Sequence, residues 1–410
     1  MVAVVLGTGG SVVSDALLPY EAFARASGFF VYTVAGQRRP VPLSGGLRAV
    51  PEHTFDTAPE PDVVVVPAVV HREQALEGWL RGAAGRGAYV LGVCAGAEVV
   101  AGAGLLAGRR ATSFWQRLGA LRRGFPGTTW IAGERFVEDD RILTTAGVTS
   151  GLAGSLRLIE LLAGRAEAIR IGQEVSYRDW TPGTSTRIPG QSLAVADLPY
   201  AMNAAFPWLR PTVGIGLTDG AGEIDVAAAF ETYAGTSFTA RAVPIAGRSA
   251  VTTRHGLLLI ALPTGPGADR GGRQPAADDA SLDRLIVLDA GHAGAELTAW
   301  GADRGLDITA PNAGRRPEEF AFDPLLRDLA EHADRATART TAKFTEHPAG
   351  HLDLTGAAWP WRSTLLGLAA LTLAVGIGML PNLIRSKMLS RRLEVVRPAI
   401  GCRSPEGTPG

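Results

Sequence analysis

The first 175 residues alternate short, wholly apolar stretches with amphipathic helical patterns. "VAVVL" near the N-terminus, "PDVVVVPA" and "AYVLGV" are apolar almost throughout, and "REQALEGWLRGAAGRG" lies between the last two with helical periodicity. A strand without a polar face must be covered on both sides, as in a parallel sheet flanked by helices. The alternation therefore predicts a doubly wound, flavodoxin-like α/β domain over residues 1–175.

The stretch "YVLGVCAGAEVVAGAGLL", residues 89–106, places Cys94 between a predicted strand and a predicted helix. Gly92 and Gly96 relieve crowding around a sharp turn, which is the layout of a nucleophile elbow. A cysteine at a helix N-terminus meets backbone N–H groups that favour the thiolate, so we expect a lowered thiol pKa. The alternative is a small apolar residue that fills the end of a strand, because cysteine is often simply buried.

The segments around Cys94 resemble the ThiJ/PfpI superfamily, which has the class I glutamine amidotransferase-like fold. They are "DALLPYEAFARA", "PDVVVVP", "LGVCAGAEVVAGAGLLAGRRATSFW" and "RFVEDDRILTTAGVTSGLAGSLRLIELLAG", in order over residues 2 to about 165. The likeness is greatest to the amidotransferase-like domain of AraC-type regulators and to isonitrile hydratases. It implies that Cys94 is the reactive residue and that Asp15 hydrogen-bonds its sulfur. In an enzyme of this kind the Ala95 N–H would be an oxyanion donor.

Two features depart from that family pattern. Phe114 stands where related regulators and several enzymes carry histidine, and "PAVVH" lacks the usual glycine pair after its proline. His71 is either a substitute base or a solvated loop residue. Glu98, one helical turn after Cys94, is either an acid lining the pocket or a surface charge, and Glu21 is a further candidate for the pocket.

Residues 211–345 are predicted to be a degenerate copy of the first domain. "VVSDALLPYEAFA" aligns without gaps with "GEIDVAAAFETYA", so that Asp225 and Glu231 follow Asp15 and Glu21 by 210 positions. "PDVVVVPAVVH" also resembles "LDRLIVLDAGH". The copy has no counterpart of the cysteine turn, so we expect any chemistry in the first half and only packing or polar contacts from the second copy's acids.

The C-terminal part of the chain is predicted to be anchored in a membrane. Residues 364–384 carry no charge and are long enough to cross a hydrocarbon core of roughly 30 Å, Trp359 and Trp361 precede them, and a dense basic stretch follows. We therefore expect a linker (346–363), a transmembrane helix (364–384) and a cytoplasmic tail (385–410). Both globular domains would then lie outside the cytoplasm, which requires a signal or anchor before residue 1; a tail-like anchor with the domains inside is the alternative.

Composition limits the partners. Formal net charge at pH 7 is zero, and the first 340 residues show no basic stripe, so a nucleic-acid partner is not expected. Two cysteines make no disulfide framework, and no Cys/His cluster has ligand spacing, so we expect neither a metal nor another cofactor. Residues 176–210 are rich in proline and are predicted to be a connector between the two domains. The resemblance leaves a homodimer open.

Two functions fit these features. In the first, Cys94 is a nucleophile towards a small carbonyl, amide or isonitrile, with a hydrolase or hydratase outcome. In the second, the same pocket is a non-catalytic sensor of a ligand or of oxidants; a scaffold with a vestigial site is a third reading. The sequence favours cysteine chemistry on a small molecule by a membrane-anchored protein.

Overall fold

The computed structural model describes residues 1–235, 237–264, 277, 280–289 and 291–374. Contacts divide the chain into two compact units, of which the first is Met1–Pro360 and the second begins at Trp361. The candidate site lies entirely in the first unit.

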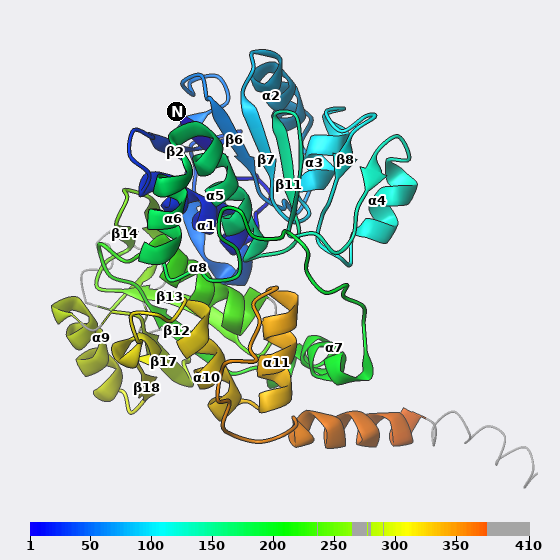
Figure 1. Cartoon of the computed structure of the whole chain (residues 1–410). Coiled ribbons are helices and arrows are strands. Elements are labelled where there is room, and N and C mark those ends of the chain that lie inside the picture. The colour runs from blue at the N-terminus through cyan, green and yellow to red at the C-terminus, as the bar shows by residue number, and fades with distance from the viewer. Residues whose placement is uncertain (236, 265–276, 278–279, 290, 375–410) are drawn as a thin grey trace, which may run out of the picture. The chain divides into compact units, whose positions relative to one another are not determined.

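A seven-stranded sheet forms the centre of the first half (Figure 1). In spatial order its strands are β10 (Phe136–Asp139), β11 (Ile142–Thr145), β7 (Tyr89–Gly92), β6 (Val63–Val66), β1 (Val2–Val5), β2 (Val31–Ala35) and β5 (His53–Thr54). Neighbouring strands run parallel, except for the antiparallel pair of β10 and β11 at one edge. The chain proceeds from β1 to β2 on one side and later to β6 on the other. Such a reversal of strand order is where open α/β sheets place their ligand sites.

Helices cover both faces of this sheet, because alternate strand residues point to opposite sides. Val2 and Val4 belong to one core with side chains of α1 and α5, whereas Ala3 and Val5 belong to a second core with α2 and α3. The helices are α1 (Val13–Ala24), α2 (Gln74–Gly85), α3 (Gly96–Gly102), α4 (Leu118–Gly124), α5 (Ser150–Ala163) and α6 (Arg165–Glu174), and β8 (Arg110–Ala111) pairs with β9 (Thr129–Trp130).

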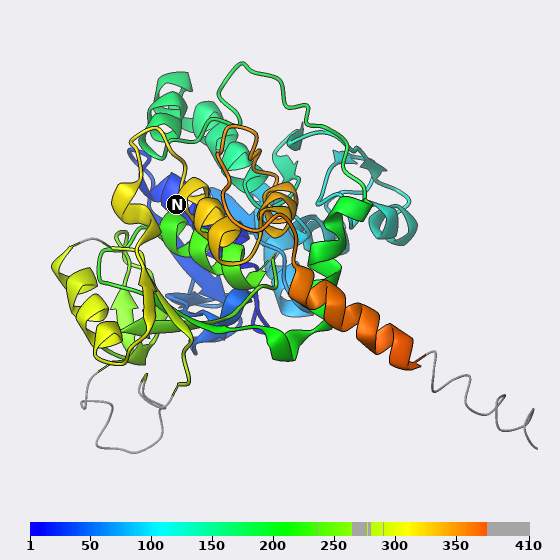
Figure 2. The same cartoon turned by 90° about the horizontal axis from the view of Figure 1, so that it is seen from below.

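A second, wholly parallel sheet forms the other half of the unit. Its order is β16 (Leu262–Pro263), β13 (Arg241–Ala246), β12 (Thr212–Gly216), β17 (Arg284–Val287) and β18 (Asp307–Thr309). The helices of this half are α7 (Leu198–Ala205), α8 (Glu223–Phe230), α9 (His292–Ala302), α10 (Phe322–His332) and α11 (Arg335–Phe344). α10 packs against both α8 and α11 (Figure 2).

The two halves meet through corresponding elements. α1 packs against α8, and β4 (Arg48–Val50) pairs with β15 (Leu258–Ile260) in a small sheet completed by β3 (Val41–Pro42) and β14 (Ala250–Thr252). The Ser14 hydroxyl donates to Glu231, and the Ile224 N–H donates to Glu21. The two donors, Ser14 and Ile224, are 210 positions apart, and so are the two acceptors, Glu21 and Glu231, as expected for two copies related by a two-fold axis. These contacts support the degenerate copy at 211–345, which stays a prediction.

The predicted transmembrane helix is wrong. Residues 361–374 are helical, and the rest of the predicted span, together with the basic tail, lies outside the described residues. In the part of the chain that the structure describes, no helix combines the length and the apolar character that a membrane span requires. A span needs about 20 apolar residues, which the described helix does not reach. The fold is mixed α/β, and the predicted single-pass membrane localisation, with its outward-facing domains, is contradicted as well.

Candidate active site

The turn after β7 is a strained elbow that presents Cys94. The backbone of Cys94 is left-handed, with φ of 56°, which is uncommon for a residue with a side chain. Its N–H donates to the Thr145 hydroxyl (3.4 Å), and its carbonyl accepts from the Ser113 hydroxyl (2.7 Å). At Gly96 an added Cβ would lie 2.0 Å from the Val66 carbonyl oxygen, so α3 can approach β6 only with glycine there. The surrounding contacts hold the elbow in its strained form.

Asp15, in the first turn of α1, lies within hydrogen-bonding distance of the Cys94 thiol. Its side chain is fully buried, and one carboxyl oxygen accepts the Ala68 N–H at 3.1 Å. Burial raises the pKa of this carboxyl well above its ordinary value; the charge of Glu231 adds to the rise, while hydrogen bonds from Ala68 and the Cys94 thiol oppose it. The carboxyl is therefore suited to hold a proton beside the sulfur.

The thiol of Cys94 differs from the sequence-based expectation. Burial raises its pKa well above the ordinary value, and the charges of Asp15, Glu346 and Glu231 raise it further, while a hydrogen bond from the Ala95 N–H opposes them. The helix N-terminus does favour a thiolate, but burial and three acidic neighbours outweigh it. Only 8% of the residue is exposed, the raised pKa favours the neutral thiol, and the Ala95 N–H donates to the sulfur.

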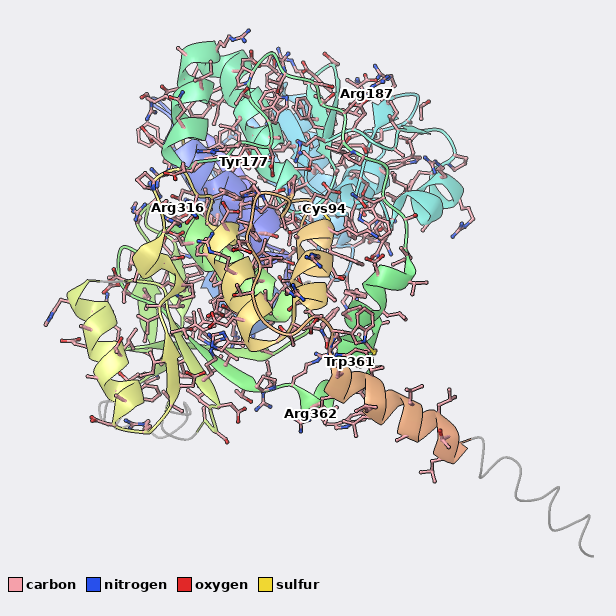
Figure 3. The ribbon with its side chains drawn as sticks, turned by 60° about the horizontal axis from the view of Figure 1, so that its bottom comes forward. Cys94, Tyr177, Arg187, Arg316, Trp361 and Arg362 are labelled. Atoms are coloured by element: carbon pink, nitrogen blue, oxygen red, sulfur yellow. The ribbon has the colours of Figure 1, made fainter. Side chains whose placement is uncertain are left out.

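The segment after α11 brings an acid to this site that sequence analysis missed. The Thr149 hydroxyl donates to the carbonyls of Thr345 and Glu346 (3.0 Å each), and the Ser150 hydroxyl donates to the Glu346 carboxylate (2.6 Å). Burial raises the pKa of Glu346 to about 7. Cys94 is labelled in Figure 3, and the charge of Glu346 contributes to the raised pKa of its thiol. No local pattern marks Glu346, because its partners lie nearly 200 positions earlier in the chain.

Glu231, the first residue of the π-helical segment Glu231–Gly235 that follows α8, completes the acidic group. Its carboxylate accepts the Ser14 hydroxyl at 3.1 Å, and burial raises its pKa to about 7. The acid that was expected to serve packing or polar contacts in the second half therefore contributes its charge to the environment of Asp15 and Cys94.

The remaining candidates lie elsewhere. His71 is exposed on the loop after β6, and Glu98 forms an ion pair with Arg117 (2.5 Å) at the surface. Glu21 is buried but turned towards the second half, where it accepts the Ile224 N–H at 2.6 Å. In the described residues, none of these three acids and bases has a contact with Cys94.

Phe114 takes part in an aromatic cluster instead of acid–base chemistry. Its ring lies 5.4 Å from that of Trp115 and 6.4 Å from that of Phe344, and a Cβ added at Gly147 would lie 2.7 Å from it. The position at which the family resemblance implied a histidine is thus filled by an apolar ring.

The loop after β6 also differs from an oxyanion hole. Its Ala68 N–H is bound to Asp15, and its Val70 N–H donates to the Gly10 carbonyl at 2.9 Å. Both amides therefore already donate hydrogen bonds within the protein and are not free to stabilise an oxyanion.

One cavity reaches the acidic group. It has a volume of about 380 Å³, and Arg135, Lys343 and Glu346 are among its lining residues. Because Glu346 also acts on Cys94 electrostatically, the cavity meets the candidate site at this carboxyl.

Two groups of side chains among the described residues have donor atoms within 4.8 Å of one another and could hold a metal ion. They are Asp323, His347 and His351, and Glu21, Glu223 and His255. Neither group contains Cys94.

The first part of the chain is similar to several known proteins. A family profile described as the DJ-1/PfpI family matches residues 1–161. The chain is 31% identical over 204 residues to an isonitrile hydratase of Pseudomonas putida, in a match that covers 47% of this chain and 84% of that enzyme. A solved structure of a ThiJ/PfpI family protein from Pseudomonas syringae is 29% identical, with a TM-score of 0.41, over 46% of this chain and 80% of that one.

A further relative is a regulator. The HTH-type transcriptional regulator CdhR of Pseudomonas aeruginosa is 33% identical over 115 residues, which are 28% of this chain and 32% of the regulator. Its name includes a helix-turn-helix, which is a DNA-binding motif. This relative therefore does not support the prediction that the chain has no nucleic-acid partner.

Proposed function

The chain belongs to the DJ-1/PfpI family, and from this premise we propose that its Cys94 thiol catalyses the hydration of small isonitriles to N-substituted formamides. The observation that carries the proposal is the neutral thiol on a strained elbow, with the buried Asp15 carboxyl beside it. The similarity to an isonitrile hydratase suggests the substrate class.

A neutral thiol suits this reaction because the isonitrile carbon takes up both the sulfur and a proton. The Cys94 sulfur forms a bond to that carbon while the thiol proton passes through Asp15 to the same carbon, giving a thioformimidate. Water then adds across the carbon–nitrogen double bond, its oxygen to the carbon and one of its protons to the nitrogen. The carbon–sulfur bond breaks as the new hydroxyl becomes the formamide carbonyl, and the second proton of the water passes to the sulfur. The net change is the addition of one water to one isonitrile, and no oxidant or metal is required.

Acyl transfer from an amide is less well supported. That reaction needs a thiolate, a base for the leaving amine and donors for an oxyanion. Phe114 occupies the family's histidine position, and the amides of Ala68 and Val70 already have partners. Hydration of an isonitrile releases no amine, so it does not need a histidine to protonate a leaving group.

A non-catalytic ligand sensor is the second candidate. It is favoured by the burial of Cys94, which limits access to the sulfur. A redox sensor is disfavoured, because oxidation is fastest for exposed thiolates of low pKa.

The test is to incubate the full chain with a small alkyl isonitrile and to follow the formamide by NMR. We expect formamide from the wild type and from Cys402→Ser, and none above the uncatalysed level from Cys94→Ser. If the wild type binds the isonitrile but makes no formamide, the site is a sensor. If Cys94→Ser is as active as the wild type, the proposed chemistry is wrong.

A further inference from the structure

The side chains of Asp323, His347 and His351 converge on one point. The Nε2 atom of His347 lies 2.7 Å from Asp323 Oδ1, and the Nε2 atom of His351 lies 3.1 Å from the same oxygen. All three donor atoms are within 4.8 Å of one another. From this convergence we propose that the three residues bind one divalent transition-metal ion, with Zn²⁺ the best match to the ligand set.

The chemistry of the donors fits this ion. Two imidazole nitrogens and one carboxylate oxygen are a common ligand set for zinc when a fourth position stays open to water or substrate. The ligands of a tetrahedral site with bonds of about 2.0–2.2 Å stand somewhat farther apart than the two hydrogen bonds seen here. An ion therefore needs only a small outward movement of the imidazoles, and His351, on an exposed loop, can provide it.

A second layer of contacts orients the ligands. The Nδ1 atom of His347 faces Asp179 at 3.1 Å, so that its other ring nitrogen is directed at Asp323. A carboxylate on the far nitrogen is the usual support of a metal-binding histidine, because it fixes the tautomer and the ring. The other oxygen of Asp323 accepts the Phe320 N–H at 3.0 Å, which holds this carboxylate in place.

The point of convergence is accessible. Asp323 and His347 are buried, whereas the side chain of His351 is 54% exposed. A cavity of about 490 Å³ is lined by all three residues and by Asp179. Arg316, labelled in Figure 3, also lines this cavity. An ion can enter from this side and keep its fourth position for water.

The competing explanation is a cluster held by a proton. Burial alone would lower the pKa of His347, but hydrogen bonds to Asp179 and Asp323 outweigh burial and raise it to about 9. An imidazolium would thus satisfy both carboxylates without a metal. A cluster held by a proton would not require His351, although the Nε2 atom of His351 approaches the same oxygen of Asp323. A metal site would require it, so replacing His351 distinguishes the two explanations.

The other convergent group is a poor metal site. Glu21 already pairs with Arg25 at 2.6 Å and lies 3.8 Å from Arg254. Two guanidinium groups at this carboxylate would repel a further cation. His255 of that group therefore serves as a matched control for His351.

The experiment uses the metal-free full chain, titrated with Zn²⁺ by calorimetry and with Co²⁺ by visible spectroscopy. We expect one equivalent of each ion and a Co²⁺ spectrum of nitrogen and oxygen ligands without thiolate bands. His351→Ala should abolish the saturable site, and Asp179→Asn should weaken it by about 10–100-fold. His255→Ala should bind as the wild type does.

Because the side chain of His351 is half-exposed, His351→Ala should fold as the wild type does, and circular dichroism checks this. Failure of the wild type to bind either ion overturns the proposal, as does equal affinity in His351→Ala. Thiolate bands in the Co²⁺ spectrum would also overturn it, because they would assign the ion to a cysteine. None of these results depends on isonitrile hydration, so this proposal and the proposed function can fail separately.

Discussion

At the scale of single residues, the chemistry of the site is set by charge and burial around one sulfur. Three carboxyl groups, from Asp15, Glu231 and Glu346, act on Cys94, and burial raises the pKa of each of them as well as that of the thiol. Groups of like charge that share a buried site cannot all ionise, so protons are retained there near neutral pH. The site is therefore better suited to deliver a proton than to attack as a thiolate.

Replacing Asp15 tests its influence on the thiol. The charge of its carboxylate contributes to the raised pKa of Cys94, so Asp15→Asn should lower that pKa. Peptide-resolved mass spectrometry of iodoacetamide labelling from pH 6 to 10 should then show Cys94 labelling that is faster than in the wild type and that begins at lower pH. Glu98→Gln, at the surface, should have no effect. Slower or unchanged labelling of Cys94 would contradict the account.

Glu231 should make stability depend on pH. Its pKa is raised from 4.5 to about 7 in the folded chain, so folding takes up a proton between these values. The wild type should therefore lose stability as pH rises from 4.5 to 7, by at most about 3 kcal/mol from this group. Glu231→Gln lacks this loss.

Urea unfolding at pH 5 and pH 7.5 measures the effect. The free energy of unfolding of Glu231→Gln, relative to the wild type, should be higher at pH 7.5 than at pH 5. A difference that is the same at both pH values would show that Glu231 is ionised in the folded chain as it is in the unfolded one.

At the scale of elements, the elbow depends on how closely α3 approaches β6. This approach leaves no room for a side chain at Gly96, where a Cβ would meet the backbone of Val66 and Pro67. By contrast, a Cβ at Gly85, the last residue of α2, would meet nothing within 4 Å. These two glycines are a matched pair for testing the elbow.

Gly96→Ala should push α3 away from the sheet and lower the free energy of unfolding by about 1–3 kcal/mol or more. Gly85→Ala should leave it unchanged or raise it by about 0.5–1 kcal/mol, because alanine favours the helix. Denaturant unfolding of both variants measures this contrast. Equal stability of the two variants would mean that α3 does not pack closely against β6 at Gly96.

Local patterns could predict the elements but not their long-range contacts. The apolar strands, the turn at Cys94 and the position of Asp15 are visible in short stretches of sequence. Glu346 could not be predicted, because its contacts with Thr149 and Ser150 join distant parts of the chain. The lowered thiol pKa was expected from the helix N-terminus alone, whereas its rise comes from burial and acids that the pattern does not reveal. The membrane span was predicted from hydropathy, and the described helix does not bear it out.

At the scale of the whole first unit, the two halves form one body around a shared core. Apolar residues of α1, α5, β12 and α8 belong to the same buried cluster. The second half covers the face of α1 and supplies Glu231 and Glu346 to the site. The two halves are therefore expected to act together, with the second half closing the site that the first half builds.

A designed disulfide tests the join between the halves. Val50 and Leu258 are neighbours across the antiparallel pair of β4 and β15, where the Cα atoms lie about 4.5–5.5 Å apart. In a Cys94→Ser, Cys402→Ser background, Val50→Cys with Leu258→Cys should form a cross-link within one chain, seen as faster migration on a non-reducing gel. Either substitution alone should not. Cross-links between chains would instead show that these strands pair in a dimer.

The most direct test of the proposed chemistry is to detect the covalent intermediate. The full chain is mixed with a small alkyl isonitrile, quenched within milliseconds to seconds, and analysed by intact-mass and peptide mass spectrometry. A gain equal to the mass of one isonitrile, located on Cys94 and lost as formamide accumulates, is the predicted result. Formamide production without such an adduct at any time, or an adduct that never turns over, would contradict the account of Cys94 as the catalytic thiol.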